Sequence, residues 1–550
     1  MSTLLARHKA LLDDALAALV TRGFWTPFPE VPSGKIYGET ARADGLAAFE
    51  ARLGKPFEMA GHPESGRVGA EASPFGPALG ISYPTADAEA LVAAAEAAGP
   101  AWAAAGPELR VGVCLEALVR LNAMSFEIGS ATMHTTGQPF AMAFQAGGPH
   151  AQDRGLEAVA VAWAEMTRSP AGAVWEKPQG KAAPLVIEKR WSLVPRGVGL
   201  VIGCNTFPTW NSYPGLFASL ATGNPVIVKP HPAATLPLAL TVAVLRDVLA
   251  EAELPRDVVL LAADSAEAPL AKALVAHPGV GIVDYTGSNA FGEWVRTNAR
   301  GAQVYTEEAG VNSVVVAGTD AFAAMCDNLA FSLALYSGQM CTTPQDIFVP
   351  RGGIETDEGH KGFDEVAAGI AAAADALLAD PARAAGVCGA IANPATLERV
   401  AAARGLGQVV RDSGPVGEGR TASPLILAVD AADEAAYGEE RFGPIAFVVA
   451  VADADEGVAR ATDLARRKGA ITAALYDTDE DRILRAAEAF AHAGVNLSVN
   501  LTGGIYVNQS AAFSDYHVTG LNPAGNASLT DAAFVAGRFR RAMWRRPKAA

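Results

Sequence analysis

The chain has 550 residues, of which 50% are hydrophobic and 19% charged. This balance excludes an intrinsically disordered chain and predicts a large globular protein of two or more domains. The net charge of −16 argues against nucleic acid as a partner, because binding to phosphates needs a basic surface. Only residues 538–550 are locally basic, and we expect this tail to be solvated or docked on a subunit.

The N-terminal residues 1–20 place charges such as Lys9 and Asp13 within a leucine pattern, which is typical of an amphipathic helix and not of a signal peptide. The longest apolar runs, such as 237–245, are shorter than the roughly 20 residues that cross a bilayer. We therefore expect a cytoplasmic protein with no membrane partner.

The cysteines and histidines give no sign of a metal site or of disulfides. None of the 5 cysteines forms a CxxC pair, and none of the 9 histidines has the i, i+4 spacing of a helical metal pair. A lone cysteine in an apolar protein is most often a small buried hydrophobe. We assign that role to Cys114, Cys204, Cys326 and Cys388.

After a first stretch of about 70 residues, rich in turns and expected to wrap the first domain, the chain settles into a regular alternation from Gly197. Short β-rich runs alternate there with helix-length segments, the pattern of a doubly wound parallel sheet. Such sheets bind ligands at the carboxyl ends of their strands. The predicted strands are 197–204, 225–230, 258–264 and 281–287, and the predicted helices include 234–252 and 289–300.

A second alternation of the same kind follows a break near residue 308 and predicts another α/β domain. We therefore divide the chain into 1–308, 309–493 and 494–550. The last part contains strand material around a Gly-Gly turn, which we expect to pair with a sheet edge or a neighbouring subunit.

Cys341 differs from the other cysteines because the helical run before it must break at Gly338. A thiol at such a corner can face a cleft and act as a nucleophile. Attack on a carbonyl also needs donors for the oxyanion and a base that completes the reaction. Glu307 and Glu308, at the break between the two domains, are candidates for the base, although adjacent acids are otherwise common on solvated surfaces.

These residues belong to a set of motifs that resembles the aldehyde dehydrogenase superfamily. The motifs are GQ-x-C at Gly338, Gln339 and Cys341, the glutamate at Glu307, EERFGP at 439–444, TGS at 286–288, ATGN…KP at 221–230 and TTGQP at 135–139. They run in family order from about residue 78 to 525. The resemblance implies the α/β aldehyde dehydrogenase fold: two doubly wound parallel-sheet domains and a small β-flap for oligomerisation, near 170–195 and 494–510.

By this resemblance Cys341 attacks an aldehyde, hydride passes to a nicotinamide, and Glu307 activates the water that releases the acid. Glu308 is the less favoured base. The resemblance also implies a set of contacts with NADP or NAD. They are Lys229 at the adenosine ribose, Gly287 and Ser288 at the pyrophosphate, Glu440 at the nicotinamide ribose and Phe442 beside the nicotinamide.

The sequence departs from the superfamily at two positions. A gapless count places Thr206 where the family has an oxyanion-binding asparagine, with Asn205 immediately beside it, and both stay candidates. Asn211 lies out of register and ranks lower. Pro232 stands where many NAD enzymes hold a ribose-binding glutamate, and without that carboxylate NADP becomes possible, with Lys229 as its cation.

Within the superfamily, the segments YTEEAGVNSVVV and SDYHVTGLNPAGN are similar to those of dehydrogenases of phenylacetic acid degradation. This resemblance implies a CoA-linked semialdehyde as substrate and a separate hydratase that opens the ring. The superfamily's flap implies a homodimer or a dimer of dimers. Two alternatives stay open: a CoA-acylating dehydrogenase, which generally lacks the glutamate found at Glu307, and a catalytically silent member with a binding or structural role.

Overall fold

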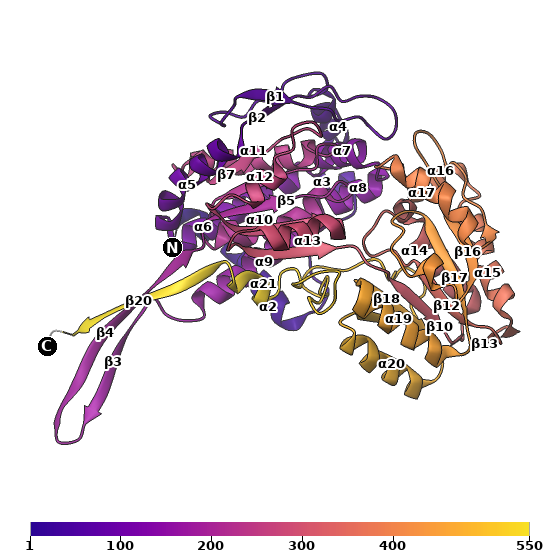
Figure 1. Cartoon of the computed structure of the whole chain (residues 1–550). Helices are drawn as coiled ribbons and strands as arrows, with labels where there is room; N and C mark the ends of the chain where they lie inside the picture. Colours follow the sequence, from indigo (N-terminus) through magenta and orange to yellow (C-terminus); the bar gives the residue numbers. More distant parts are fainter. Residues whose placement is uncertain (1, 549–550) are drawn as a thin grey trace.

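The computed structural model describes residues 2–548, so the last two residues of the basic tail lie outside the described part. Two α/β lobes lie side by side, and a long antiparallel arm projects from the first of them (Figure 1). One lobe is built on a five-stranded sheet and the other on a seven-stranded sheet. Within residues 2–548, no helix is long and apolar enough to cross a membrane.

The five-stranded sheet is parallel throughout, in the order β7-β6-β5-β8-β9. Its central strands are apolar on both faces because helices cover both sides. The chain changes direction across the sheet between β5 and β8, and such a switch point opens a crevice at the carboxyl ends of the strands. The strands are β5 (Val198–Ile202), β6 (Val226–Lys229), β7 (Val259–Leu261), β8 (Val280–Gly287) and β9 (Gln303–Glu308). The helices between them are α10 (Pro208–Ala221), α11 (Leu236–Glu251), α12 (Ala271–Val275) and α13 (Asn289–Asn298).

The residues before this sheet form helices that share its core. Leu5 and Leu12 are buried in the same apolar cluster as Val228 of β6. The first 70 residues, which we expect to wrap the first lobe, thus form helices joined by irregular segments. The helices are α1 (Thr3–Arg7), α2 (Lys9–Thr21), α3 (Gly34–Tyr37), α4 (Ala41–Glu50), α5 (Ala88–Ala104), α6 (Gly106–Ala123), α7 (Ser125–Thr136), α8 (Phe140–Gly147) and α9 (Pro149–Thr167). A short hairpin-like pair, β1 (Gly66–Val68) and β2 (Tyr83–Thr85), lies among them.

The seven-stranded sheet has the order β15-β16-β17-β12-β10-β18-β19, with only the edge strand β15 antiparallel. Successive residues of β10 point to opposite faces, so Val314 and Val316 enter one apolar core and Val315 enters the other. The strands are β10 (Ser313–Val316), β12 (Asp346–Pro350), β15 (Gln408–Arg411), β16 (Leu425–Asp430), β17 (Ile445–Val451), β18 (Thr472–Tyr476) and β19 (Asn496–Val499). The helices include α14 (Phe322–Ala334), α15 (Phe363–Leu377), α16 (Pro381–Cys388), α17 (Ala395–Ala403), α19 (Ala454–Lys468) and α20 (Glu480–His492).

The assignment of residues 494–510 to the flap was wrong. β19 lies in the second lobe, where it pairs in parallel with β18. The reason is that α20 provides the crossover that returns the chain beside β18, and parallel neighbours need such a connection. Leu497 also packs against the apolar core of this lobe.

The projecting arm is a three-stranded antiparallel sheet of β3 (Gly172–Gln179), β4 (Ala182–Pro195) and β20 (Phe539–Pro547). The basic C-terminal segment supplies its third strand, paired with β4 from Phe539 opposite Pro195 to Pro547 opposite Ile187. The arm leaves the first lobe and most of its length is exposed (Figure 1). The predicted flap segment near 170–195 forms the paired strands β3 and β4, and their third strand is the C-terminal segment.

Candidate functional site

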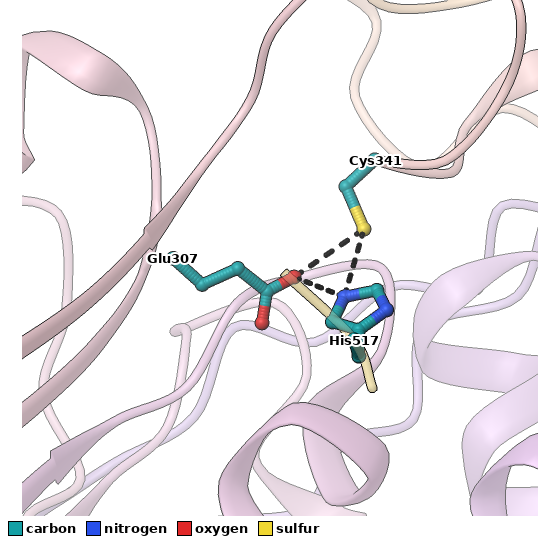
Figure 2. A group of neighbouring side chains, drawn as sticks. All are labelled: Glu307, Cys341 and His517. Carbon is teal, nitrogen blue, oxygen red and sulfur yellow. Dashed lines mark hydrogen bonds and ion pairs between the residues drawn. The ribbon is translucent and has the colours of Figure 1, made fainter. Parts of the chain in front are cut away.

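Three side chains meet where the first lobe faces the second (Figure 2). The Cys341 thiol donates to Oε1 of Glu307 at 3.4 Å, and Nε2 of His517 lies 2.9 Å from the same oxygen. The distance from Nε2 of His517 to Sγ of Cys341 is 4.0 Å. Glu307 comes from the carboxyl end of β9, Cys341 from the loop after α14, and His517 from the loop after β19.

Cys341 is presented by a sharply turned segment. Tyr336, Ser337 and Gly338 have φ angles of 51°, 49° and 64°, in the left-handed region that only glycine adopts readily. Side-chain hydrogen bonds from Tyr336 and Ser337 to backbone carbonyls hold the turn. A Cβ atom at Gly338 would lie 2.4 Å from the carbonyl oxygen of Gly443, so glycine is required there.

Two buried amides fix the loop on either side of this turn. Gln339 donates to the carbonyl of Ala390 at 3.0 Å and accepts from the N–H of Ala392 at 2.8 Å. Asn312, which precedes β10, donates to the carbonyl of Cys341 at 2.8 Å. Gln339 and Asn312 therefore hold the loop that carries Cys341, which gives both amide side chains a structural role.

Glu307 is buried and both of its carboxylate oxygens have partners. Oε1 contacts Cys341 and His517, and Nδ2 of Asn211 donates to Oε2 at 2.8 Å. Burial alone would raise the pKa of the Glu307 carboxyl, but His517, Cys341 and Asn211 outweigh it and leave that pKa lowered. The carboxylate is therefore ionised at neutral pH and can accept a proton.

The sulfur of Cys341 lies in the opposite electrostatic situation. Burial and the neighbouring Glu307 raise the pKa of the Cys341 thiol well above its ordinary value. The thiol therefore needs a nearby proton acceptor before it can attack an electrophile. A second thiol, Cys204, lies nearby and contacts Oδ1 of Asn211 at 3.5 Å, and burial raises the pKa of Cys204 to about 11.

Of the two adjacent acids, only Glu307 contacts the thiol. Glu308 forms an ion pair with Arg296 of α13. Burial raises the pKa of Glu308, and Arg296 opposes that rise without cancelling it. Glu308 lines a different cleft from the cavity that leads to Cys341.

The three asparagine and threonine candidates for the oxyanion site differ in what they contact. Asn211 donates its amide to Glu307. The Thr206 hydroxyl lies 4.0 Å from Sγ of Cys204, and the Thr206 carbonyl accepts from Nε2 of Gln138 at 2.7 Å. Oδ1 of Asn205 is buried and has no hydrogen-bond partner in the part of the chain that the structure describes.

Three of the predicted cofactor residues lie at or beside the cleft between the lobes. The cleft has a volume of about 850 Å³, and its walls include Ser288 and Glu440. Burial raises the pKa of Glu440 to about 7. Gly287 ends β8 directly before Ser288, whereas Phe442 does not line the cleft and its carbonyl accepts from Arg399.

The backbone at the start of α13 fits the phosphates of a dinucleotide. A Cβ atom at Gly287 would lie 2.4 Å from the hydroxyl of Tyr285, so a larger residue there would require the Tyr285 side chain to move. The free N–H groups and the dipole at the N-terminus of a helix favour anions. Gly287, Ser288 and Glu440 would thus hold the pyrophosphate and ribose of NAD or NADP.

Lys229 ends β6 in a setting that the sequence did not reveal. Its Nζ lies 2.7 Å from Oδ1 of Asp264, which follows the neighbouring strand β7, and donates to the carbonyl of Pro230 at 2.9 Å. Burial lowers the pKa of Lys229, although Asp264 opposes the change. Lys229 is therefore not a free cation.

A cavity of about 710 Å³ leads to Cys341. Aromatic side chains from distant parts of the chain form much of its wall: Phe24, Trp25, Phe28, Phe207, Trp210, Phe331 and Tyr506. The one arginine in this wall, Arg154, is paired with Glu157 at 2.9 Å, and no lysine lines the cavity within residues 2–548. The wall thus offers apolar surface and no unpaired basic side chain.

His517 and Asp264 are the site residues that the sequence analysis missed. His517 lies in the segment SDYHVTG, which was noted only as part of a resemblance. No local pattern connects His517 to Glu307, since the two are brought together by the loop after β19. Asp264 could have been found from its place directly after a predicted strand, where ligands of parallel sheets bind.

Residues 82–526 match the aldehyde dehydrogenase family. The crystal structure of an NAD-dependent aldehyde dehydrogenase from Burkholderia multivorans matches this chain with a TM-score of 0.98. The two sequences are 54% identical, and the match covers 100% of each chain. N-succinylglutamate 5-semialdehyde dehydrogenase from Burkholderia mallei is 30% identical over a match that covers 49% of this chain and 55% of that protein. The chain thus spans about half the length of the curated relatives it matches. A 1-pyrroline-5-carboxylate dehydrogenase from Thermus, solved with bound NAD, is similar in fold, with a TM-score of 0.75. It is 21% identical, and the match covers 96% of this chain and 99% of that one.

Proposed function

The chain belongs to the aldehyde dehydrogenase family of NAD(P)-dependent oxidoreductases, and we propose that it oxidises an aldehyde to a carboxylic acid through a thioester on Cys341. The observation that carries this proposal is the contact of 3.4 Å between the Cys341 sulfur and an ionised Glu307 at the end of a cavity. A nucleophile beside a general base is the arrangement that covalent catalysis on a carbonyl requires.

In the proposed mechanism, the Cys341 thiolate attacks the aldehyde carbon and gives a thiohemiacetal. Ser288 and Glu440 would hold a nicotinamide dinucleotide in the cleft between the lobes, and this cofactor would supply the hydride acceptor. Glu307 then takes a proton from a water molecule, which attacks the thioester carbon and releases the acid. Glu440 and Ser288 hold the cofactor in this scheme, and Glu308 takes no part in proton transfer.

The oxyanion of the thiohemiacetal needs a hydrogen-bond donor. We propose the NH2 group of Asn205 or the hydroxyl of Thr206 as this donor, since the unpartnered atom of Asn205 is the acceptor Oδ1, which cannot donate to an oxyanion. The amide of Asn211 is used by Glu307. If Asn205 is the donor, Asn205→Ala lowers kcat much more than Thr206→Val does, and the reverse order would identify Thr206 as the donor.

For the substrate, we propose a CoA-linked semialdehyde of phenylacetic acid degradation, on the resemblance to the phenylacetic acid degradation protein PaaN. The aromatic wall of the cavity favours a substrate with a long uncharged carbon chain next to its aldehyde group. A semialdehyde with a carboxylate near its reactive end would meet Glu30 and Asp515 and no unpaired cation. Ring opening would then be the work of a separate hydratase.

For the cofactor, we propose NAD in preference to NADP. The carboxylate of Asp264, 2.7 Å from Lys229, neutralises the cation that would attract a 2′-phosphate. The Burkholderia multivorans relative is described as NAD-dependent. An acid at this position also accepts hydrogen bonds from ribose hydroxyls, as acids after a strand do in other dinucleotide sites.

For the assembly, we propose a cytoplasmic homodimer or dimer of dimers joined through the arm. The arm carries exposed apolar side chains, among them Trp175, Met543 and Trp544. Its strand edges are also available for pairing. A chain shortened after residue 537 lacks β20, and its mass in solution should fall to that of a smaller assembly.

The proposed function is tested by comparing three aldehydes with each cofactor: the ring-opened CoA semialdehyde generated in situ, N-succinylglutamate 5-semialdehyde and a simple aliphatic aldehyde. We expect the highest kcat/KM for the CoA semialdehyde with NAD and free acid as the product. A preference for the succinylated substrate would overturn the substrate proposal. Acyl-CoA formed only with added CoA would instead establish a CoA-acylating enzyme, and no turnover of any aldehyde would indicate a silent member of the family.

A further inference from the structure

We propose that His517 is a third catalytic residue, which accepts the proton of Cys341 and, as an imidazolium, holds the thiolate and the Glu307 carboxylate side by side. This inference rests on the proposed dehydrogenase function, since it concerns the same thiol. It starts from the observation that one ring nitrogen of His517 lies within reach of both reacting groups (Figure 2).

The geometry around His517 leaves its ring little freedom. The side chain is buried, and the ring packs edge-to-face on Trp210, with centroids 4.7 Å apart. The N–H of Leu529 donates to the His517 carbonyl at 3.1 Å and fixes the backbone. Nε2 therefore stays directed at Oε1 of Glu307, 2.9 Å away, and at Sγ of Cys341, 4.0 Å away.

The charges around the site explain why an imidazolium is needed. Ionised Cys341 would place a second negative charge 3.4 Å from the Glu307 carboxylate in a buried site, and like charges at that distance oppose each other strongly. From α10, the uncharged Asn211 and Trp210 face the pair. The Cys204 thiol and the Glu440 carboxylate also raise the pKa of the Cys341 thiol, so neither offers the thiolate a positive charge. Arg154 of α9 lies beyond Trp210, over the ring at 5.4 Å.

Arg154 is already occupied by other partners. It pairs with Glu157 and donates to Ser510 and to the carbonyl of Asp515. Within residues 2–548, His517 is thus the only side chain that contacts both Cys341 and Glu307 and can become a cation. This makes it the counter-charge of the thiolate.

The proton transfer balances without any added reagent. Starting from the tautomer with the proton on Nδ1, the S–H bond of Cys341 breaks as its proton moves to Oε1 of Glu307, 3.4 Å away, and on to the lone pair of Nε2, 2.9 Å from that oxygen. An N–H bond forms, Glu307 is again a carboxylate and Cys341 becomes a thiolate. The new Nε2–H donates to Glu307. When water later attacks the thioester, its proton passes to Glu307, the C–S bond breaks and the thiolate leaves toward the same imidazolium.

A test of this role uses the thiol alone, without aldehyde or cofactor. The rate at which iodoacetamide alkylates Cys341 is measured from pH 5 to 10 by peptide mass spectrometry, in wild type, His517→Gln and the control His62→Gln. His62 is also buried and accepts a hydrogen bond, from the N–H of Leu261 at 3.0 Å, but lies away from the site. NAD-linked oxidation of a simple aldehyde is measured on the same samples.

We expect His517→Gln to slow alkylation at pH 7 by roughly tenfold or more and to move the profile to higher pH, because less thiolate is present. His62→Gln should keep the wild-type profile. For turnover, His517→Gln should lower kcat by roughly 100-fold with little change in KM, the scale of a lost acid–base group. Added imidazole should restore part of the alkylation rate to His517→Ala, which a purely structural role would not predict.

An alkylation profile of His517→Gln that matches wild type, together with no rescue by imidazole, would overturn the role of His517. A shifted profile in an enzyme whose wild type oxidises no aldehyde would instead support His517 as the partner of the thiolate and remove the proposed dehydrogenase function.

Discussion

The centre around Cys341 and the cleft around Glu440 are built on different principles. At Cys341, the reacting groups contact one another, and both oxygens of Glu307 have protein partners. The Glu440 carboxylate lines an open cleft and makes no hydrogen bond or ion pair within the described residues 2–548. The comparison suggests that the protein itself organises the proton-transfer centre, whereas the cofactor cleft is completed by its ligand.

The largest effect should come from the organised centre. Cys341→Ala removes the nucleophile while leaving Glu307 its contacts with His517 and Asn211. We expect kcat to fall by roughly 10⁴-fold or more, the scale seen when an essential nucleophile is lost. Cofactor binding, measured by fluorescence titration, should stay near the wild-type value because Cys341 does not line the cleft. Substantial turnover by Cys341→Ala would end the account of the centre.

The cofactor cleft should respond to pH near neutrality. Burial raises the pKa of Glu440 to about 7, so the group is protonated below that pH and ionised above it. The ionised form accepts hydrogen bonds from ribose hydroxyls, and KM for NAD should therefore rise as the pH falls below 7, approaching tenfold per pH unit at its steepest.

Glu440→Gln provides the matched variant for this measurement, since glutamine keeps the shape of the side chain and does not titrate. Its KM for NAD should be higher than that of wild type at pH 8 and nearly constant from pH 6 to 8. A wild-type KM that is flat over this range would show that Glu440 is not a cofactor contact.

A smaller effect is expected at the other end of the cofactor. Asp264→Asn removes the carboxylate that neutralises Lys229. The ratio of kcat/KM for NADP to that for NAD should increase by roughly tenfold, because a carboxylate beside a 2′-phosphate opposes its binding. An unchanged ratio would mean that Asp264 does not face the ribose.

Much of the fold could be predicted from periodicity alone. The predicted strand 197–204 contains β5 (Val198–Ile202), and 281–287 falls within β8, because buried apolar runs between turn residues are a strong local signal. The position of 494–510 could not be read in this way. β19 is a short strand whose partner, β18, is chosen by the packing of the α20 crossover and not by its own residues.

The residues of the site also differ in how far the sequence alone could predict them. Cys341 and Glu307 lie in motifs with local signatures, a forced turn at Gly338 and a glutamate at a strand end, and their contact follows from both. His517 carries no such signature, since a histidine in a loop is compatible with many roles. Only the path of the chain after β19 brings it to Glu307, so its part in the centre became visible in three dimensions.

The central claim is that Cys341 forms a thioester that Glu307 hydrolyses, and the most direct measurement is the intact mass of Glu307→Gln after mixing with aldehyde and NAD. The glutamine cannot take a proton from water, so acylation should proceed and deacylation should slow by roughly 10²- to 10⁴-fold. We predict a covalent acyl adduct on Cys341, formed with one equivalent of NADH and absent in Cys341→Ala. Rapid turnover by Glu307→Gln with no adduct would contradict the claim.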